Sequence, residues 1–474
     1  QSERLRLEIE LVESAHKWRG ALFARMTEAG IDVGNFNDDR KKPEELKRRA
    51  QDDDEAWEDR LTKTTDARVF NPSSREQVAE LLFQRLDLDL ADNVQEKDLW
   101  TESGERSTND AVLRSYVGDP LLKHNGVSSL VHALRMLRRA TKTHSTFVHP
   151  LRPAWGEPRC YLHRDGRAHP SYRAFGTGVG RIAASEPNTL NQPPNVRAMF
   201  TAPSGYSLVD CDQDSLHLRI IGSRWRIPSL QEAYLGKPRL HRGHRMGPHE
   251  LFAELLYGDR FMKSPHGTWP PENTAQKFKG EAKFCRDAGK TTRYAGAYVA
   301  KLGTIYREVT SAEDKKTGEL AFSHLTMSDV EDLYDTWMTR EPEWARAWTM
   351  EKETWTRQSY IDEPLLGRRR YCGDEKETDV INFPILGLEA ALMNVITIEI
   401  TQAIPFEYIG PGPNKGPARH VAGLINQNYD SVLVEVPAEQ AAKTRGIVEE
   451  IMTRSMPGMD IPFKGEAKII QAWS

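Results

Sequence analysis

Apolar residues recur at helical spacing in the first part of the chain. One run, from Leu5 through Trp18 to Met26, predicts a helix that ends at Gly30. A second run covers residues 127–139 and predicts another helix. We therefore expect residues 1–145 to be mainly helical.

After residue 146 the pattern changes to short runs separated by turns rich in glycine. The segment 206–211 predicts a strand, and 215–223 predicts the helix that follows it. Helical periodicity returns in residues 223–375, with a long run from Asn273 to Leu302. The C-terminal part has a predicted helix, 386–402, and a predicted hairpin whose strands, 424–426 and 432–436, flank the turn 427–431.

Composition places the chain among ordinary globular proteins and leaves its partner open. Its 474 residues are enough for two or three domains, with 38% hydrophobic residues, 28% charged residues and a mean hydropathy of −0.63. The net charge is −4, so the global balance does not indicate a nucleic-acid partner. A groove lined by Lys and Arg can still exist in an acidic protein.

The four cysteines, at positions 160, 211, 285 and 372, form no CxxC pair, which argues against a zinc knuckle and a disulfide framework. A reducing, cytoplasmic setting fits this usage best. No apolar run approaches the roughly 20 residues that span a bilayer, and no signal peptide opens the chain, so we expect no membrane association.

Two aspartates are candidates for a metal site. Asp212 follows a predicted strand, and Asp430 lies in the predicted C-terminal hairpin. Nucleotidyl transfer uses two divalent ions clamped by carboxylates on rigid elements. An Asp in a turn is more often structural. Asp210 and Asp214 compete with Asp212 for the first position.

A stripe of four residues suggests a nucleotide site on one helix. Arg286, Lys290, Tyr294 and Tyr298 follow at steps of four and so point to one side. Two cations followed by two aromatic rings suit a triphosphate and a base or sugar. A surface helix with an aromatic edge in the core is the plainer reading. Gly289 and Gly296 each cost the helix about 1 kcal/mol, which hints at a close approach.

Two further segments carry DNA-contact candidates. Residues 177–194 contain Gly and Asn turns that present Arg181, a pattern suited to a phosphate or minor-groove contact. The helix 127–139 ends in a basic group that includes Arg135, Arg138 and Arg139, either a solvated face or a tip that touches phosphates.

In their order, these segments resemble family A DNA polymerases, the class of bacterial DNA polymerase I. Asp212 with Arg219 resembles motif A, and this spacing selects Asp212 over its neighbours. The stripe from Arg286 to Tyr298 resembles motif B, and Gln427–Ser431 resembles motif C. The resemblance runs from about residue 20 to the end. Further matches are Thr177–Asn191, Asn382–Gly387, Phe70–Ser74 and Trp473.

The resemblance implies an α+β, multidomain, right-hand polymerase with an antiparallel palm sheet and mostly helical thumb and fingers. The thumb would be 1–145, the palm 146–222 and 376–474, and the fingers 223–375. It implies DNA synthesis from dNTPs on primer–template DNA with two Mg²⁺ ions, which Mn²⁺ can replace. The divergent motifs suggest a phage or other viral source, with a monomer and replication accessory proteins as candidate partners.

The resemblance also assigns roles to residues. Asp212, Asp430 and the backbone carbonyl of Gln213 would bind metal, and Lys290 would be the acid for pyrophosphate departure. Nucleotide contacts would come from Arg286, Lys290, Tyr294, Tyr298, His249 and His217. DNA contacts would come from Arg181, Asn188, Asn191, Asn382, Gln427, Tyr429, Arg135, Arg138 and Arg139.

The chain departs from the family pattern at the sugar and primer contacts. His217 stands where the family has Glu, the residue that blocks a ribose 2′-hydroxyl; its imidazole would fill this space and accept a hydrogen bond from Tyr298. Motif C reads Tyr429-Asp430-Ser431 instead of His-Asp-Glu. We expect activity with altered fidelity or sugar selectivity.

Two rival functions stay open at this point. One is a single-subunit, ribonucleotide-using RNA polymerase, which the loss of the Glu and the Asp-Ser of motif C favour. The other is an inert primer–template-binding relative, against which the joint presence of both aspartates and both motif B cations argues. The thumb-like pattern starts almost at residue 1, so we expect no proofreading exonuclease in this chain.

Overall fold

A computed structural model describes residues 2–33, 70–89, 96–119, 122, 125–241, 244–263, 280–312, 320, 322, 325–371, 377–405, 408–409, 419–420 and 423–473. The chain divides into two compact units, each with its own core. One comprises Gln1–Leu7, Ser145–Ile305 and Ser328–Ser474, and we call it the sheet unit. The other, the helical unit, comprises Glu8–His144 and Tyr306–Met327.

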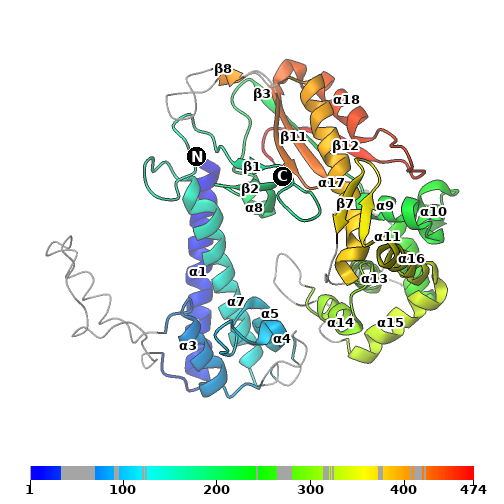
Figure 1. Ribbon diagram of the computed structural model, residues 1–474. Coiled ribbons are helices and arrows are strands. Elements are labelled where there is room, and N and C mark those ends of the chain that lie inside the picture. The colour runs from blue at the N-terminus through cyan, green and yellow to red at the C-terminus, as the bar shows by residue number, and fades with distance from the viewer. Residues whose placement is uncertain are drawn as a thin grey trace. The chain divides into compact units, whose positions relative to one another are not determined.

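Helices make up the helical unit, as the periodicity predicted. They are α1 (Ser2–Glu28), α3 (Arg75–Ala79), the π-helical turn Glu80–Arg85, α4 (Glu96–Leu99), α5 (Asp110–Gly118) and α7 (Val127–Thr143). In Figure 1, α1 and α7 run side by side. Leu22, Met26, Leu130 and Leu134 belong to their common core, and Phe70 is buried in the same core.

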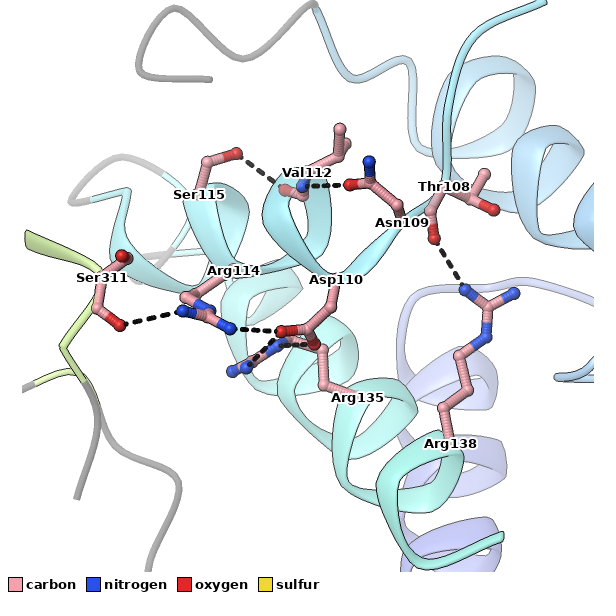
Figure 2. Close-up of polar contacts among 9 residues, drawn as sticks. All are labelled: Thr108, Asn109, Asp110, Val112, Arg114, Ser115, Arg135, Arg138 and Ser311. Atoms are coloured by element: carbon pink, nitrogen blue, oxygen red, sulfur yellow. Dashed lines mark hydrogen bonds and ion pairs between the residues drawn. The ribbon is translucent and has the colours of Figure 1, made fainter. Parts of the chain in front are cut away.

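Two residues of the basic group at the end of α7, Arg135 and Arg138, make hydrogen bonds within the helical unit (Figure 2). Arg135 is only 5% exposed, and its Nε donates to Asp110 Oδ1 at 2.9 Å. Arg138 donates to the carbonyls of Pro72 and Thr108, both at 2.8 Å. A solvated face is therefore wrong for Arg135, because its guanidinium is buried against α5. The predicted DNA contact of these two residues gains no support from this arrangement, and that of Arg139 stays a prediction.

A four-stranded antiparallel sheet is the centre of the sheet unit, with strand order β10-β11-β3-β12. The strands are β3 (Tyr206–Gln213), β10 (Gly423–Asn428), β11 (Ser431–Pro437) and β12 (Gly465–Ile470). Two helices, α17 (Glu377–Ala403) and α18 (Ala441–Met452), pack on it (Figure 1). The predicted turn 427–431 is shorter in the structure, since Gln427 and Asn428 belong to β10 and only Tyr429 and Asp430 connect the strands.

The long helix α17 begins nine residues before its predicted start at Leu386. Pro384 lies inside it, where a proline removes a backbone donor from the helix. By length and composition α17 could span a bilayer, so the expectation that no apolar run is long enough was wrong. However, 67% of its most apolar 18-residue stretch is buried within the protein. The helix packs against α16, α18 and β6, so it is a core helix.

Helices and short hairpins complete the sheet unit. The helices are α8 (Pro194–Arg197), α9 (Leu216–Trp225), α10 (Pro228–Leu235), α11 (Pro248–Tyr257), α12 (Asp259–Met262), α13 (Gly280–Gly296), α15 (Met327–Arg340) and α16 (Glu343–Gln358). A further helix, α14 (Leu302–Thr310), begins in this unit and continues into the helical unit. The hairpin strands are β1 (Ser171–Arg173), β2 (Ala183–Ser185), β4 (Leu240–His241), β5 (His244–Arg245), β6 (Tyr360–Glu363), β7 (Arg368–Tyr371), β8 (Tyr408–Ile409) and β9 (Arg419–His420). Short turns are His144–Val148, His149–Leu151, Thr189–Asn191 and Ala438–Gln440.

The two units do not correspond one to one with the predicted thumb, palm and fingers. The helical unit covers most of the predicted thumb, 1–145, but also takes in Tyr306–Met327 from the predicted fingers range. There the carbonyl of Ser311 accepts a hydrogen bond from Arg114 at 3.3 Å (Figure 2). The finer boundaries within the sheet unit stay predictions.

The two glycines of α13 differ in their surroundings. A Cβ on Gly296 would lie 2.4 Å from Cζ3 of the buried Trp337, whereas one on Gly289 would make ordinary contacts of 3.6 Å or more. The close approach that the sequence hinted at is therefore a side-chain contact, and it exists at Gly296 only.

We expect Gly296→Ala to destabilise the protein by about 1–3 kcal/mol, because an indole in the core would have to move. Gly289→Ala is the matched control and should be neutral or stabilising by up to about 1 kcal/mol, since alanine favours the helix. Urea unfolding followed by circular dichroism measures both. Equal effects of the two substitutions would contradict this account.

Candidate active site

The two predicted aspartates meet at one end of the sheet. The pairing of β3 with β11 sets Asp212 opposite Ser431, the residue directly after Asp430. In addition, the backbone N–H of Gln213 donates to the carbonyl of Asp430 at 3.0 Å. The turn between β10 and β11 is strained, since Tyr429 has a φ of 54°, a left-handed conformation that costs a non-glycine residue about 1–2 kcal/mol.

Their electrostatics show that the carboxylates interact. Partial burial, followed by the charges of Asp430 and Asp210, raises the pKa of Asp212 to about 7. Burial also raises the pKa of Asp430. Asp212 still has an exposed side chain, so solvent screens part of this repulsion. A cation between the two carboxylates would relieve what remains.

The residues present fit Mg²⁺ better than a metal with an all-protein cage. Among the described residues no group of three or more His, Cys, Asp or Glu side chains could hold an ion. Mg²⁺ is commonly held by one or two carboxylates together with substrate phosphates and water. Asp212 and Asp430 match that donor set, and the predicted Gln213 carbonyl lies on the same strand end.

Three residues of the predicted stripe, Arg286, Lys290 and Tyr294, lie along α13, whereas Tyr298 lies in the turn that follows the end of this helix at Gly296. Lys290 Nζ is 5.9 Å from the centre of the Tyr294 ring, and this ring lies 5.7 Å from that of His249 on α11. Arg286 donates through Nε to Glu250 Oε1 at 2.6 Å, which fixes its guanidinium beside the start of α11. The cations and His249 therefore form one cluster, with the tyrosines at its other end.

His249 is buried and electrically neutral at physiological pH. Burial first, and then the charges of Lys290, Arg286 and Arg293, lower its pKa to about 3. Its Nδ1 is buried and has no hydrogen-bond partner in the described protein. An anion bound among these cations would offset their charge and raise the pKa of the ring.

Glu389 is a site residue that the motifs missed. It lies in α17, is 1% exposed and accepts hydrogen bonds from Arg181 Nη2 and from His217 Nε2, the latter at 2.6 Å. Sequence offers one signal, since Glu389 is the one charged residue between Val380 and Ile398. The predicted hydrogen bond from Tyr298 to His217 is wrong: the Tyr298 hydroxyl has no partner in the described protein, and the rings meet edge to face at 6.4 Å.

The DNA-contact candidates of the sheet unit fall into two groups. Arg181 lies over the Tyr429 ring at 5.0 Å, and the Tyr429 hydroxyl bonds Asn191 at 2.8 Å, so these three residues are together. Asn188 caps the turn Thr189–Asn191 and is exposed. In contrast, Gln427 is buried and accepts a hydrogen bond from Thr397, and within the described protein the buried Asn382 Oδ1 has no partner.

A cavity of about 500 Å³ opens elsewhere in the sheet unit. Its lining includes Tyr172, Trp473 and the ion pair of Arg167 with Glu435, whose atoms lie 2.9 Å apart. None of the predicted site residues lines it. The candidate site is therefore not this cavity but the open end of the sheet and the adjacent face of α13.

Comparison with known proteins agrees with the motifs. The sequence profile described as DNA polymerase family A matches residues 40–246, which include Asp212 and its surroundings. Over this range the chain is similar to DNA polymerase family A. It is 24% identical over 414 residues to the thermostable DNA polymerase I of Thermus filiformis, and 24% identical over 425 residues to that of Thermus aquaticus. Both alignments cover 85% of this chain and 42% of the relative.

A plant protein and a solved structure extend the comparison. DNA polymerase I A, chloroplastic/mitochondrial, of Arabidopsis thaliana is 24% identical over 409 residues, which cover 82% of this chain and 36% of the relative. The polymerase domain of Pol1 from M. smegmatis, solved with DNA primer-template and dNTP, has a TM-score of 0.67 at 18% identity and covers 100% of this chain and 66% of its own. This likeness confirms the predicted fold, a right-hand polymerase of the α+β type. The chain spans less than half the length of the curated relatives.

We expect Asp212→Asn to stabilise the metal-free protein above pH 7. The pKa of Asp212 is raised on folding, so the folded state holds an extra proton between pH 3.8 and about 7 and loses stability as pH rises through that window. After allowance for screening, the gain at pH 8 should be about 1 kcal/mol and should vanish near pH 4. Thermal unfolding in EDTA measures it, with the exposed Asp332→Asn as control; a loss of stability at pH 8 would contradict the repulsion.

We also expect the His249 ring to stay neutral at pH 5 and to gain basicity when an anion binds. Its pKa is held near 3 partly by neighbouring cations, and a triphosphate would offset their charge. NMR titration of the imidazole, with and without a dNTP, measures the pKa, and the signal lost in His249→Gln identifies the ring. A pKa near 6.5 without ligand would refute the buried, cation-surrounded state.

Proposed function

We propose that this chain is a template-directed DNA polymerase that adds dNTPs to a primer 3′-hydroxyl and releases pyrophosphate. The proposal rests on one observation above all: Asp212 and Asp430 meet at the end of the sheet, with the Gln213–Asp430 backbone bond of 3.0 Å between their strands. The match to the family A model over residues 40–246 and the cationic cluster of α13 and α11 support it. The M. smegmatis polymerase domain was solved in complex with primer-template and dNTP, and we propose the same partners for this chain.

In this proposal each residue of the site has its own role in nucleotidyl transfer. Arg286, Lys290 and His249 bind the triphosphate, and Lys290 protonates the departing pyrophosphate. Tyr294 lies against the base and sugar, while Asp212 and Asp430 orient the reacting groups. Two Mg²⁺ ions held by these carboxylates would lower the pKa of the primer hydroxyl and neutralise charge on the phosphorus.

Primer and template contacts are proposed from the same arrangement. The group formed by Arg181, Asn191 and Tyr429 lies beside the carboxylates and can bind a primer backbone or minor groove. Gln427, being buried, would have to act through Thr397 or after a local change. A cytoplasmic location, a monomeric state and a phage origin stay predictions.

The proposal is tested by primer extension with Mg²⁺ on a DNA template. Asp212→Asn and Asp430→Asn should each reduce extension by at least about 10³-fold, because each removes half of the carboxylate pair. Asp210→Asn lies on the same strand, further from the turn, and should retain most activity. Primer–template binding, followed by fluorescence anisotropy, should persist in all three.

Two results would overturn the proposal in different ways. Tight primer–template binding by the wild-type chain without extension would leave an inert relative. Extension that prefers rNTPs would favour the RNA polymerase alternative.

A further inference from the structure

The buried carboxylate of Glu389 determines how His217 is held. A carboxylate only accepts hydrogen bonds, so His217 Nε2, at 2.6 Å, must carry the proton. Arg181 Nη2 lies 3.2 Å from the same nitrogen, but two donors cannot bond each other. Both therefore point at the same Glu389 oxygen, Oε2, and this oxygen fixes the imidazole orientation.

The imidazole also contacts Tyr298, in the turn that follows α13. Its ring meets the ring of Tyr298 at a centroid distance of 6.4 Å and an angle of 84°. The His217 side chain is 28% exposed, so one edge stays accessible. Glu389, His217 and Arg181 are also close enough to Asp430 for their charges to act on its pKa. The network thus lies between the carboxylate pair and the tyrosines.

This location matters because a bound dNTP would place its sugar there. With the outer phosphates at Lys290 and the innermost phosphate at Asp212 and Asp430, the next group is the ribose, directed towards Tyr298. A side chain excludes an extra hydroxyl only if it cannot move aside. His217 alone could rotate about two torsions, but its bond to the buried Glu389 and the contact with Tyr298 hold it in one orientation.

We propose that Glu389 is a positioning residue for sugar selection, which holds the His217 ring so that its bulk excludes a ribose 2′-hydroxyl. This inference rests on the proposed DNA polymerase function. A structural ion pair is the competing explanation. The sheet unit contains such a pair for comparison: Glu351, also 1% exposed, accepts hydrogen bonds from Arg224 at 2.7 Å and Trp225 at 3.0 Å. Neither Arg224 nor Trp225 is a predicted site residue, whereas both partners of Glu389 come from predicted functional segments.

The test compares incorporation of one dNTP with its matching rNTP by the wild-type chain, Glu389→Ala, His217→Ala, their double variant and Glu351→Ala. We expect Glu389→Ala to lower the dNTP-to-rNTP ratio of kcat/KM about tenfold or more, mainly by improving rNTP use. The double variant should be no less selective than His217→Ala, because Glu389 acts through that ring. Glu389→Gln should be intermediate, since its amide oxygen can still accept from His217 but its NH₂ faces Arg181.

Glu351→Ala is the matched control for losing a buried carboxylate and should lower the unfolding midpoint without changing the ratio. If Glu389→Ala lowers dNTP and rNTP use equally, or reduces only stability as Glu351→Ala does, the network is structural and the inference is overturned. An additive double variant would equally refute action through His217. A wild-type chain that extends with neither nucleotide would instead remove the proposed function and, with it, this inference.

Discussion

The antiparallel pairing of β3 with β11 is the constraint on which the rest of the site depends. It brings together residues more than two hundred positions apart and leaves two carboxylates at one strand end, where burial first, and then the charges of Asp430 and Asp210, raise the pKa of Asp212 to about 7. A left-handed Tyr429 in the connecting turn adds backbone strain. Neither feature stabilises the fold by itself. A sheet that holds cations at an open strand end has to accommodate both the charge repulsion and the backbone strain.

The long helix α17 organises the surroundings of this strand end. Its apolar face fills the core, yet its middle carries Glu389, whose charge is met by Arg181 and His217. Next to it, Arg368 Nη2 donates to the carbonyls of Val179, at 2.8 Å, and Gly387, at 3.1 Å. Gly180 in this loop has a φ of +90°, a left-handed conformation that favours glycine. The loop that presents Arg181 is thus held by Glu389 of α17 and by Arg368 of β7.

Local sequence patterns predicted those helices and strands whose own residues show a clear periodicity. Periodicity located α1, α7, β3 and α9, and the hairpin of Asp430, because alternation and helical spacing are properties of neighbouring residues. The start of α17 was missed, because Pro384 argues for a boundary that tertiary packing overrides. The contact of His217 with Glu389 spans 172 positions, and no local pattern contains it. Likewise, basic residues at a helix end looked solvated, but Asp110 on another helix buries Arg135.

Replacement of a motif residue therefore has to be judged by its contacts. His217 in place of the family's glutamate suggested a weakened site, and on sequence alone it kept the ribonucleotide-using alternative open. In the structure a glutamate does stand beside it, supplied by α17 instead of α9. Burying a carboxylate with two nitrogen donors costs desolvation free energy, and apolar residues of similar volume would often stabilise the core equally well. Its presence at the nucleotide end, and not merely somewhere in the core, is the physical reason to connect it with substrate recognition.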